Sequence, residues 1–327
     1  MSLRANISAK KMMAVLALVL VCALVVLLWV LFKMFGGADL VGFSEGSTDE
    51  IMYVERFPAS EDPALENPIG IDSDGRRLYV AESGAGCIAV FTLDGRRLDD
   101  IAVPPAEGRS DVYPSDVAVM GDGRIAVTDN ASARVLVLRT DKKAAPVSVI
   151  GEDGSRAPDQ PTALAYANGE LFVADGSSHT VLVFSADSGE YLRELGQELS
   201  PPLTYCGGMF LAEDGLHITD SNAGRVLVLD ARSGELVHVL PEHYVLPRGI
   251  VQGIDSEEFV VDTFGKKVVA ITGEGIRRFG TDELTDPMAE LLSPRDACWI
   301  GEHGRLYVTD ANAGDVVVYN VRLPGAE

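Results

Sequence analysis

Residues 218–229 read ITDSNAGRVLVL, and residues 308–319 read VTDANAGDVVVY. A catalytic motif is normally needed once in a chain, whereas a structural unit can recur. Each stretch contains a β-branched run that ends at an acidic residue, a four-residue turn, and a second β-branched run. This is the pattern of two short strands joined by a tight turn. The repetition therefore predicts a fold assembled from similar sheet units.

The pattern occurs six times. The copies are YVAESGAGCIAVF, AVTDNASARVLVL, FVADGSSHTVLVF, HITDSNAGRVLVL, FVVDTFGKKVVAI and YVTDANAGDVVVY. Each copy has one acidic residue before its turn, and we call these six residues the turn carboxylates: Glu82, Asp129, Asp175, Asp220, Asp262 and Asp310. They are 47, 46, 45, 42 and 48 residues apart, so the period is close to 46.

Each unit also contains two further runs. A short apolar run, introduced by Pro or by Cys206, comes before a hairpin signal such as DSDG or EDG, and a more polar run such as EYLREL ends the unit. Four short antiparallel strands in 46 residues are typical of one β-propeller blade. The sequence therefore predicts an all-β, six-bladed β-propeller with four-stranded antiparallel blades.

The two ends of the repeat region complement one another. The last unit has three strands, RDACWI, RLYVTD and DVVVYNV, and lacks a fourth. Residues 50–57, EIMYVERF, precede the first unit and match the fourth-strand pattern. We expect residues 50–57 to complete the last blade, because this closes the ring and removes exposed sheet edges.

The N-terminal 35 residues form a different kind of segment. Met12 to Phe32 is an uncharged run of 21 residues, which as a helix would span roughly 30 Å, the thickness of a bilayer's hydrocarbon core. Arg4, Lys10 and Lys11 precede it and favour a cytoplasmic N-terminus. A cleavable signal peptide is the alternative, but its apolar region would be shorter and would end at a small-residue site.

Three regions are therefore predicted. Residues 1–35 are a cytoplasmic N-terminus with one transmembrane signal anchor, residues 36–49 a flexible Gly/Ser-rich stalk, and residues 50–327 an extracytoplasmic propeller. The chain carries 27 basic and 49 acidic residues, a formal charge of −22, which excludes nucleic acid as a partner. Cys87, Cys206 and Cys298 are far apart and odd in number, so we expect buried thiols and no dependence on disulfides.

The repeated unit resembles NHL repeats. The blade pattern P-x-G-I…D-G-x-L-Y-V-A-D-x-x-x-x-R-V-x-V-F is similar to that family, and YVTD, HITD and AVTD are similar to the related YWTD propellers, without their Trp. The resemblance covers about residues 50–321 and implies six blades. Propellers of this kind include binding modules, scaffolds and enzymes, so it does not choose among these functions.

Metal sites are known in two enzyme groups of this kind. Amidating lyases of this type hold a metal with several histidines, but the five histidines here do not share the position from which side chains converge on the channel: His179, His217, His238, His243 and His303. Calcium-dependent lactonases are the other group. Asp72–Gly75 looks like the start of a calcium loop but lacks its closing Glu, and is better explained as a hairpin turn.

The residues that start the innermost strands would surround the channel. Arg248 and Arg295 belong to adjacent blades and could hold a carboxylate or phosphate, with Tyr205 beside them. The alternative is that both arginines pair with Asp116 and Asp296. The turn carboxylates are expected to accept backbone N–H groups in their turns, with metal binding as the alternative.

These observations favour a membrane-tethered extracytoplasmic binding or scaffold module for a protein or small ligand. We expect no catalytic residue, no metal and no cofactor. Two alternatives stay open: an enzyme of lactonase or amidating-lyase type with its site in the channel, and an accessory subunit of a membrane complex.

Overall fold

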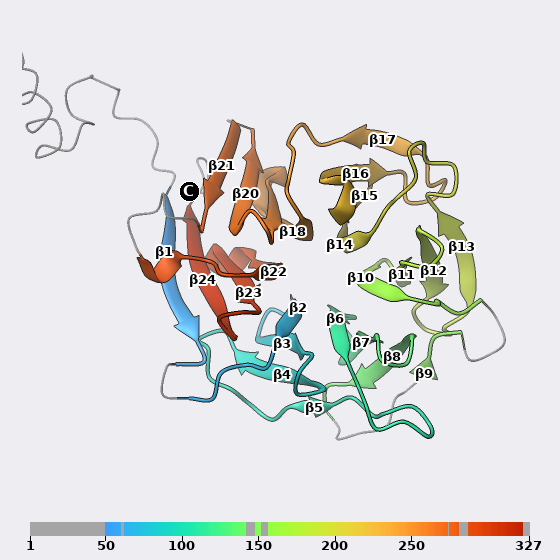
Figure 1. Ribbon diagram of the computed structural model, residues 1–327, viewed down its shortest axis with the longest axis horizontal. Coiled ribbons are helices and arrows are strands. Elements are labelled where there is room, and N and C mark those ends of the chain that lie inside the picture. Colours follow the sequence, from blue (N-terminus) through green and yellow to red (C-terminus); the bar gives the residue numbers. More distant parts are fainter. Residues whose placement is uncertain are drawn as a thin grey trace, which may run out of the picture. The chain divides into compact units, whose positions relative to one another are not determined.

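The chain folds into six four-stranded antiparallel sheets arranged around a central channel (Figure 1). The computed structural model describes residues 50–59, 62–141, 148–151, 156–273, 275–280 and 287–322. The prediction of an all-β, six-bladed propeller with four-stranded antiparallel blades is confirmed. The expected transmembrane segment and stalk lie outside the described residues, and among those residues no helix has the length and apolar character needed to cross a bilayer.

Blades 1 to 6 follow one another along the chain, and each is built from the channel outward. The innermost strands are β2 (Pro68–Ser73), β6 (Pro114–Val119), β10 (Pro161–Ala167), β14 (Cys206–Leu211), β18 (Pro247–Gln252) and β22 (Pro294–Ile300). The second strands are β3 (Arg77–Glu82), β7 (Arg124–Asp129), β11 (Glu170–Asp175), β15 (Leu216–Asp220), β19 (Glu258–Asp262) and β23 (Arg305–Asp310). Every second strand therefore ends at a turn carboxylate.

The outer half of each blade completes the pattern. The third strands are β4 (Cys87–Thr92), β8 (Arg134–Arg139), β12 (Thr180–Ser185), β16 (Arg225–Leu229), β20 (Lys267–Thr272) and β24 (Asp315–Arg322). The outermost strands are β5 (Ile101–Ala102), β9 (Ser148–Val149), β13 (Tyr191–Leu195), β17 (Leu236–Val239), β21 (Gly275–Phe279) and, in blade 6, β1 (Glu50–Phe57). Short 3₁₀ turns are η1 (Ser221–Ala223), η2 (Ile254–Ser256), η3 (Pro287–Ala289) and η4 (Gly301–His303).

The first described strand closes the ring. β1 pairs antiparallel with β24, from Glu50 opposite Arg322 to Phe57 opposite Val316. Arg56 then fastens the joint, because its guanidinium donates two hydrogen bonds of 3.0 Å to Asp315 and one of 2.8 Å to the Met288 carbonyl. Figure 1 shows β1 at the outer edge of blade 6, away from the channel.

The hydrophobic core is divided among the joints between blades. Six clusters of buried residues occur, and each combines side chains from two neighbouring sheets. In the joint between blades 6 and 1, Phe57 packs 5.0 Å from Phe91, measured between ring centroids. Both faces of the second and third strands are covered, which explains their continuous Val, Leu and Ile runs. The innermost strands line the central channel with both charged and apolar side chains.

Tight turns join the second and third strands. In blades 4 and 6 the last turn residue is Gly224 or Gly314, at φ values of 65° and 71°. Glycine takes up this left-handed conformation without a steric penalty. We call the side of the ring that carries these turns the front face. The innermost strands begin at the front face and end at the back face.

Candidate functional site

The turn carboxylates hold each blade's innermost strand against its second strand. Each accepts a backbone N–H from the segment that leads into the innermost strand of its own blade. The donors are Glu66 to Glu82, Tyr113 to Asp129, Gln160 to Asp175, Thr204 to Asp220, Leu246 to Asp262 and Ser293 to Asp310, at 2.8–3.0 Å. Several also accept an N–H within the turn, as Asp262 does from Gly265 at 3.1 Å.

Four turn carboxylates have an arginine beside them as well. The pairs are Glu82 with Arg97 (2.7 Å), Asp129 with Arg134 (3.0 Å), Asp220 with Arg225 (2.9 Å) and Asp310 with Arg56 (4.0 Å). All six carboxylates are buried and hydrogen-bonded. In the described part of the chain, no group of three or more His, Cys, Asp or Glu residues could hold a metal ion.

The front end of the channel opens into a cavity of about 180 Å³, which we call the front mouth. Tyr113, Tyr205, Arg248 and Arg295 lie around it, and Asp116 and Asp296 belong to its lining as well. The structure therefore brings together all five residues that the sequence placed at the channel rim, and it adds Tyr113.

Within the described part of the chain, neither arginine of the front mouth pairs with a carboxylate. The Arg248 guanidinium lies over the Tyr205 ring, 4.9 Å from its centroid. The Nε atoms of Arg248 and Arg295 are buried and have no hydrogen-bond partner, and no ion pair joins either residue to an acidic side chain within the described ranges. Burial, and secondarily the charge of Arg248, lowers the pKa of Arg295. The alternative in which the arginines pair with Asp116 and Asp296 is therefore wrong.

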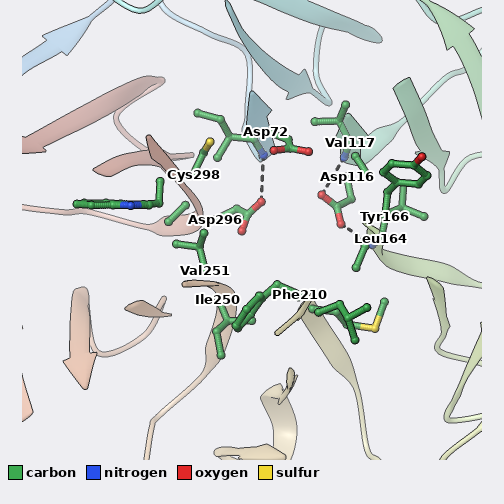
Figure 2. A pocket seen from close by; sticks show the side chains of 18 residues that line it. Asp72, Asp116, Val117, Leu164, Tyr166, Phe210, Ile250, Val251, Asp296 and Cys298 are labelled. Carbon is green, nitrogen blue, oxygen red and sulfur yellow. Dashed lines mark hydrogen bonds between the residues drawn. The ribbon is translucent and has the colours of Figure 1, made fainter. Parts of the chain in front are cut away.

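The inward carboxylates bond to the backbone of the next blade instead. The donors are Ile71 to Asp296 (3.0 Å), Val119 to Asp72 (2.7 Å) and Leu164 to Asp116 (2.7 Å). Three carboxylates thus link the innermost strands of blades 6, 1, 2 and 3 in series. Figure 2 shows Asp72, Asp116 and Asp296 facing into the channel.

Close packing of the innermost strands explains why glycine alternates with aspartate near their starts. A Cβ atom on Gly70 would lie 2.5 Å from a carboxylate oxygen of Asp116, and one on Gly249 would lie 2.5 Å from an oxygen of Asp296. These distances are far below van der Waals contact. The glycines of blades 1 and 5 therefore leave room for the carboxylates of blades 2 and 6.

The pKa of each of the three channel carboxylates is raised. They are partly accessible from the channel, and the protein around that channel makes their surroundings less polar than water. Burial raises the pKa of Asp72 to about 6 and that of Asp296 to about 7. Burial, followed by the charge of Asp296, raises the pKa of Asp116 well above its ordinary value. Near neutral pH these groups therefore offset less of the arginine charge than three ionised carboxylates would.

The back end of the channel forms a second cavity of about 260 Å³, the back cavity (Figure 2). Most residues that line it are apolar or aromatic, and its charged groups are the three channel carboxylates. Its larger side chains include Tyr166, Met209, Phe210 and Trp299. Asp116 and Asp296 line both cavities, so they mark the boundary between the front mouth and the back cavity.

Sequence reasoning missed Asp72 as a channel residue. It assigned Asp72–Gly75 to a hairpin turn. Asp74 does serve that turn, by accepting the N–H groups of Arg76 and Arg77 at 2.9 and 2.7 Å. Asp72 lies two residues after Gly70 on an inner strand, and alternation puts both on the channel side. The two-residue alternation along the inner strand therefore could have identified Asp72 as a channel residue.

The histidine with the strongest interactions lies away from the lining of both cavities. His217 is fully buried; its Nε2 lies 2.9 Å from Asp214, and its Nδ1 lies 3.0 Å from Glu258 of blade 5. Burial lowers the pKa of His217, but hydrogen bonds and the negative charges of Glu258 and Asp214 outweigh it and raise the pKa overall. His217 therefore joins two blades. Cys87, Cys206 and Cys298 are free thiols.

No protein-family model matches the chain. Several solved structures share its fold. A protein of unknown function from Bacteroides thetaiotaomicron aligns with a TM-score of 0.64 at 16% identity, covering 85% of this chain and 73% of that one. Virginiamycin B lyase from Staphylococcus aureus aligns at 0.55 with 19% identity, over 85% and 90% of the two chains.

A third comparison leads to a different kind of protein. A chain of the mitotic checkpoint complex aligns with a TM-score of 0.60 at 12% identity, covering 87% of this chain and 96% of that one. At such low identities the similarity shows the β-propeller fold alone. An enzyme and a component of a protein assembly share it, so function has to be argued from the site.

Proposed function

We propose that this protein is a membrane-tethered, extracytoplasmic propeller of the NHL type that binds an anionic ligand in its front mouth. Two neighbouring guanidinium groups are partly buried and have no carboxylate partner among the residues that the structure describes, and this observation carries the proposal. A buried unpaired charge is costly, so its presence favours a site completed by a ligand. Arginine suits carboxylate and phosphate because its planar group can donate two parallel hydrogen bonds.

The rest of the chain is consistent with such a role. With a formal charge of −22, the chain repels most anions, so an anion would be selected by these two arginines and not by general attraction. The apolar run of residues 12–32 would tether the propeller. β1 enters the ring at the outer edge of blade 6, so the front mouth lies away from this connection.

Calorimetric titration of the full-length protein in detergent micelles with benzoate and with inorganic phosphate tests the proposal. One site is expected, and Arg248→Gln or Arg295→Gln should weaken binding about tenfold or more, because each removes charge-assisted hydrogen bonds. Arg96→Gln is the matched control, since Arg96 is exposed on the outer part of blade 1. Unchanged affinity in both front-mouth variants would refute this function.

A channel enzyme is the second candidate, because one observation favours it. The pKa of Asp296 is raised to about 7, the range in which a carboxyl can act as a general acid or base. The fold shared with a streptogramin B lyase (18% identity, TM-score 0.58) makes a lyase assay reasonable. Turnover abolished by Asp296→Asn, with anion binding retained, would favour this candidate.

A further inference from the structure

Large apolar side chains are exposed on one side of the front mouth. Phe264 is 70% exposed, Val245 63% and Leu292 42%. Val245 and Leu292 each precede an arginine of the front mouth, Arg248 or Arg295, by three residues. We call Val245, Phe264 and Leu292 the apolar rim. Neighbouring exposed apolar groups of this kind mark interaction sites more often than single ones do.

Hydrogen bonds hold the apolar rim together across two blades. Thr263, next to Phe264, donates its backbone N–H to the Leu246 carbonyl at 3.0 Å. The Thr263 hydroxyl donates to the Pro294 carbonyl at 2.6 Å. The turn that carries Phe264 is thus fastened to both segments that lead to the arginines. Three residues of chain span at most about 10 Å, which limits the distance between the rim residues Val245 and Leu292 and the arginines that follow them.

The exposure is one-sided. Among the described front-face residues with exposed large apolar side chains, Met288 belongs to the connection that ends at Leu292, and only Tyr113 lies on another side, on blade 2. The Tyr113 hydroxyl accepts a 2.9 Å hydrogen bond from Asn67, so this side chain is already engaged by a polar neighbour. A bound peptide that ran across the front mouth would pack on apolar side chains on both sides of it. A peptide that ended in the front mouth would pack on them on one side only, as the structure shows.

We propose that the front mouth and the apolar rim bind the carboxyl end of a peptide. The terminal carboxylate lies between Arg248 and Arg295, and apolar side chains at the third and fourth positions from the end pack on the rim. An extended peptide, at about 3.3 Å per residue, can cover this distance of at most about 10 Å within three residues. This inference rests on the proposed function, since it names the class of anion.

The polar lining of the front mouth favours a peptide over a fatty acid. Ser115, Thr162 and Tyr205 line the cavity beside the arginines. A peptide can meet these groups with its last polar residues and its backbone amides, whereas an acyl chain is apolar along its whole length. A fatty acid would need a continuous apolar groove from carboxylate to tail, and the polar lining interrupts one.

Binding of labelled peptides to the full-length protein tests the proposal. The probes are two fluorescein-labelled hexapeptides, Gly-Ser-Leu-Val-Ser-Ala and Gly-Ser-Phe-Leu-Ser-Ala, each as the free acid and as the C-terminal amide, with fluorescence anisotropy as the readout. The free acids should bind at least about tenfold more tightly than the amides. Arg248→Gln should remove that difference, and Phe264→Ser should weaken the free acids about three- to tenfold.

Matched controls separate a site effect from a loss of folding. Val237→Ser removes a comparably exposed apolar side chain from β17, and Arg96→Gln removes an exposed charge; neither should change peptide affinity. Equal binding of acid and amide, no effect of Phe264→Ser, or tighter binding of decanoate than of either peptide would overturn the inference. If benzoate and phosphate bind in an arginine-dependent way but neither peptide does, the inference fails and the proposed function stands.

Discussion

The turn carboxylates and the channel residues differ in whether their acidic and basic side chains pair. At the turns, acid and base lie together: Asp220, for example, accepts the Thr204 N–H at 2.9 Å and pairs with Arg225 at 2.9 Å. In the channel, acidic and basic side chains line the front mouth together but do not pair. Asp72, Asp116 and Asp296 bond to backbone amides, while Arg248 and Arg295 have no carboxylate partner in the described chain.

This difference separates charges that stabilise the fold from charges available for binding. A position that recurs in every blade is paired and satisfied, as a structural device must be when it is buried. The arginines occur in two blades only, and their Nε atoms have no hydrogen-bond partner. Such a group lowers the free energy of unfolding, and proteins keep it where a function requires it. Replacing a turn carboxylate or its arginine partner should therefore lower the free energy of unfolding, whereas replacing a front-mouth arginine should raise it.

The largest effect is expected at the closing blade. Asp310 is fully buried and accepts the N–H groups of Leu292 at 2.7 Å, Ser293 at 2.8 Å and Ala313 at 3.3 Å. Asp310→Ala leaves these donors without an acceptor and removes the more distant of the two carboxylates beside Arg56, which keeps Asp315. We expect a loss of about 3–5 kcal/mol in the free energy of unfolding.

Urea unfolding of the full-length protein in micelles, followed by tryptophan fluorescence, measures this loss. Asp99→Ala is the matched control, because Asp99 is an exposed aspartate of blade 1. A change below about 1 kcal/mol for Asp310→Ala would show that the turn carboxylates do not stabilise the ring as argued.

The next effect is a pH dependence that arises in the channel. The pKa of Asp296 is raised to about 7 and that of Asp72 to about 6, above their ordinary value of 3.8. Between pH 4 and 7 the folded protein therefore holds more protons than the unfolded chain, so stability from these groups is complete below pH 4 and falls as pH rises. Asp296→Asn mimics the protonated acid and should remove about 1–2 kcal/mol of that fall.

Comparison of unfolding midpoints at pH 5 and pH 8 measures the effect. His217 contributes in the same direction, since its pKa is raised and its stabilising charge is lost as pH increases. The test is therefore the difference between wild type and Asp296→Asn, not the slope of either alone. Identical slopes would mean that Asp296 stays ionised in the folded protein.

Much of the fold could be predicted because it is repeated. Six copies of one pattern reveal strand order, and Glu82 and its counterparts mark the end of each second strand. The channel could be predicted only in part, because its residues differ from blade to blade. Arg248, Arg295 and Asp116 follow an opening proline and could be placed at the rim. Their partners could not, since bonds such as Leu164 N–H to Asp116 join different blades.

The back cavity shows the same limit. Phe210 and Trp299 occur once each at their positions on the inner strands, so no repeat identified them. They line one cavity only because blades 4 and 6 are brought together around the channel. Arg56 is a further example. It takes the place near Asp310 that Arg225 holds near Asp220, although it comes from the opposite end of the chain. A repeated sequence pattern identifies the features that all blades share, whereas the residues that form the channel sites differ from blade to blade.

The smallest effect is a pair of changes in the free energy of unfolding that should have opposite signs. Arg295→Met removes a partly buried charge whose Nε has no partner and keeps the apolar stem of the side chain. Because the ordinary cost of burying that charge is removed, the free energy of unfolding should rise by about 1 kcal/mol. Arg225→Met removes the partner of Asp220 and should lower it by about 1–2 kcal/mol. If both variants lose stability by similar amounts, the front-mouth arginines are held by bonds within the protein, and the case for a ligand there is lost.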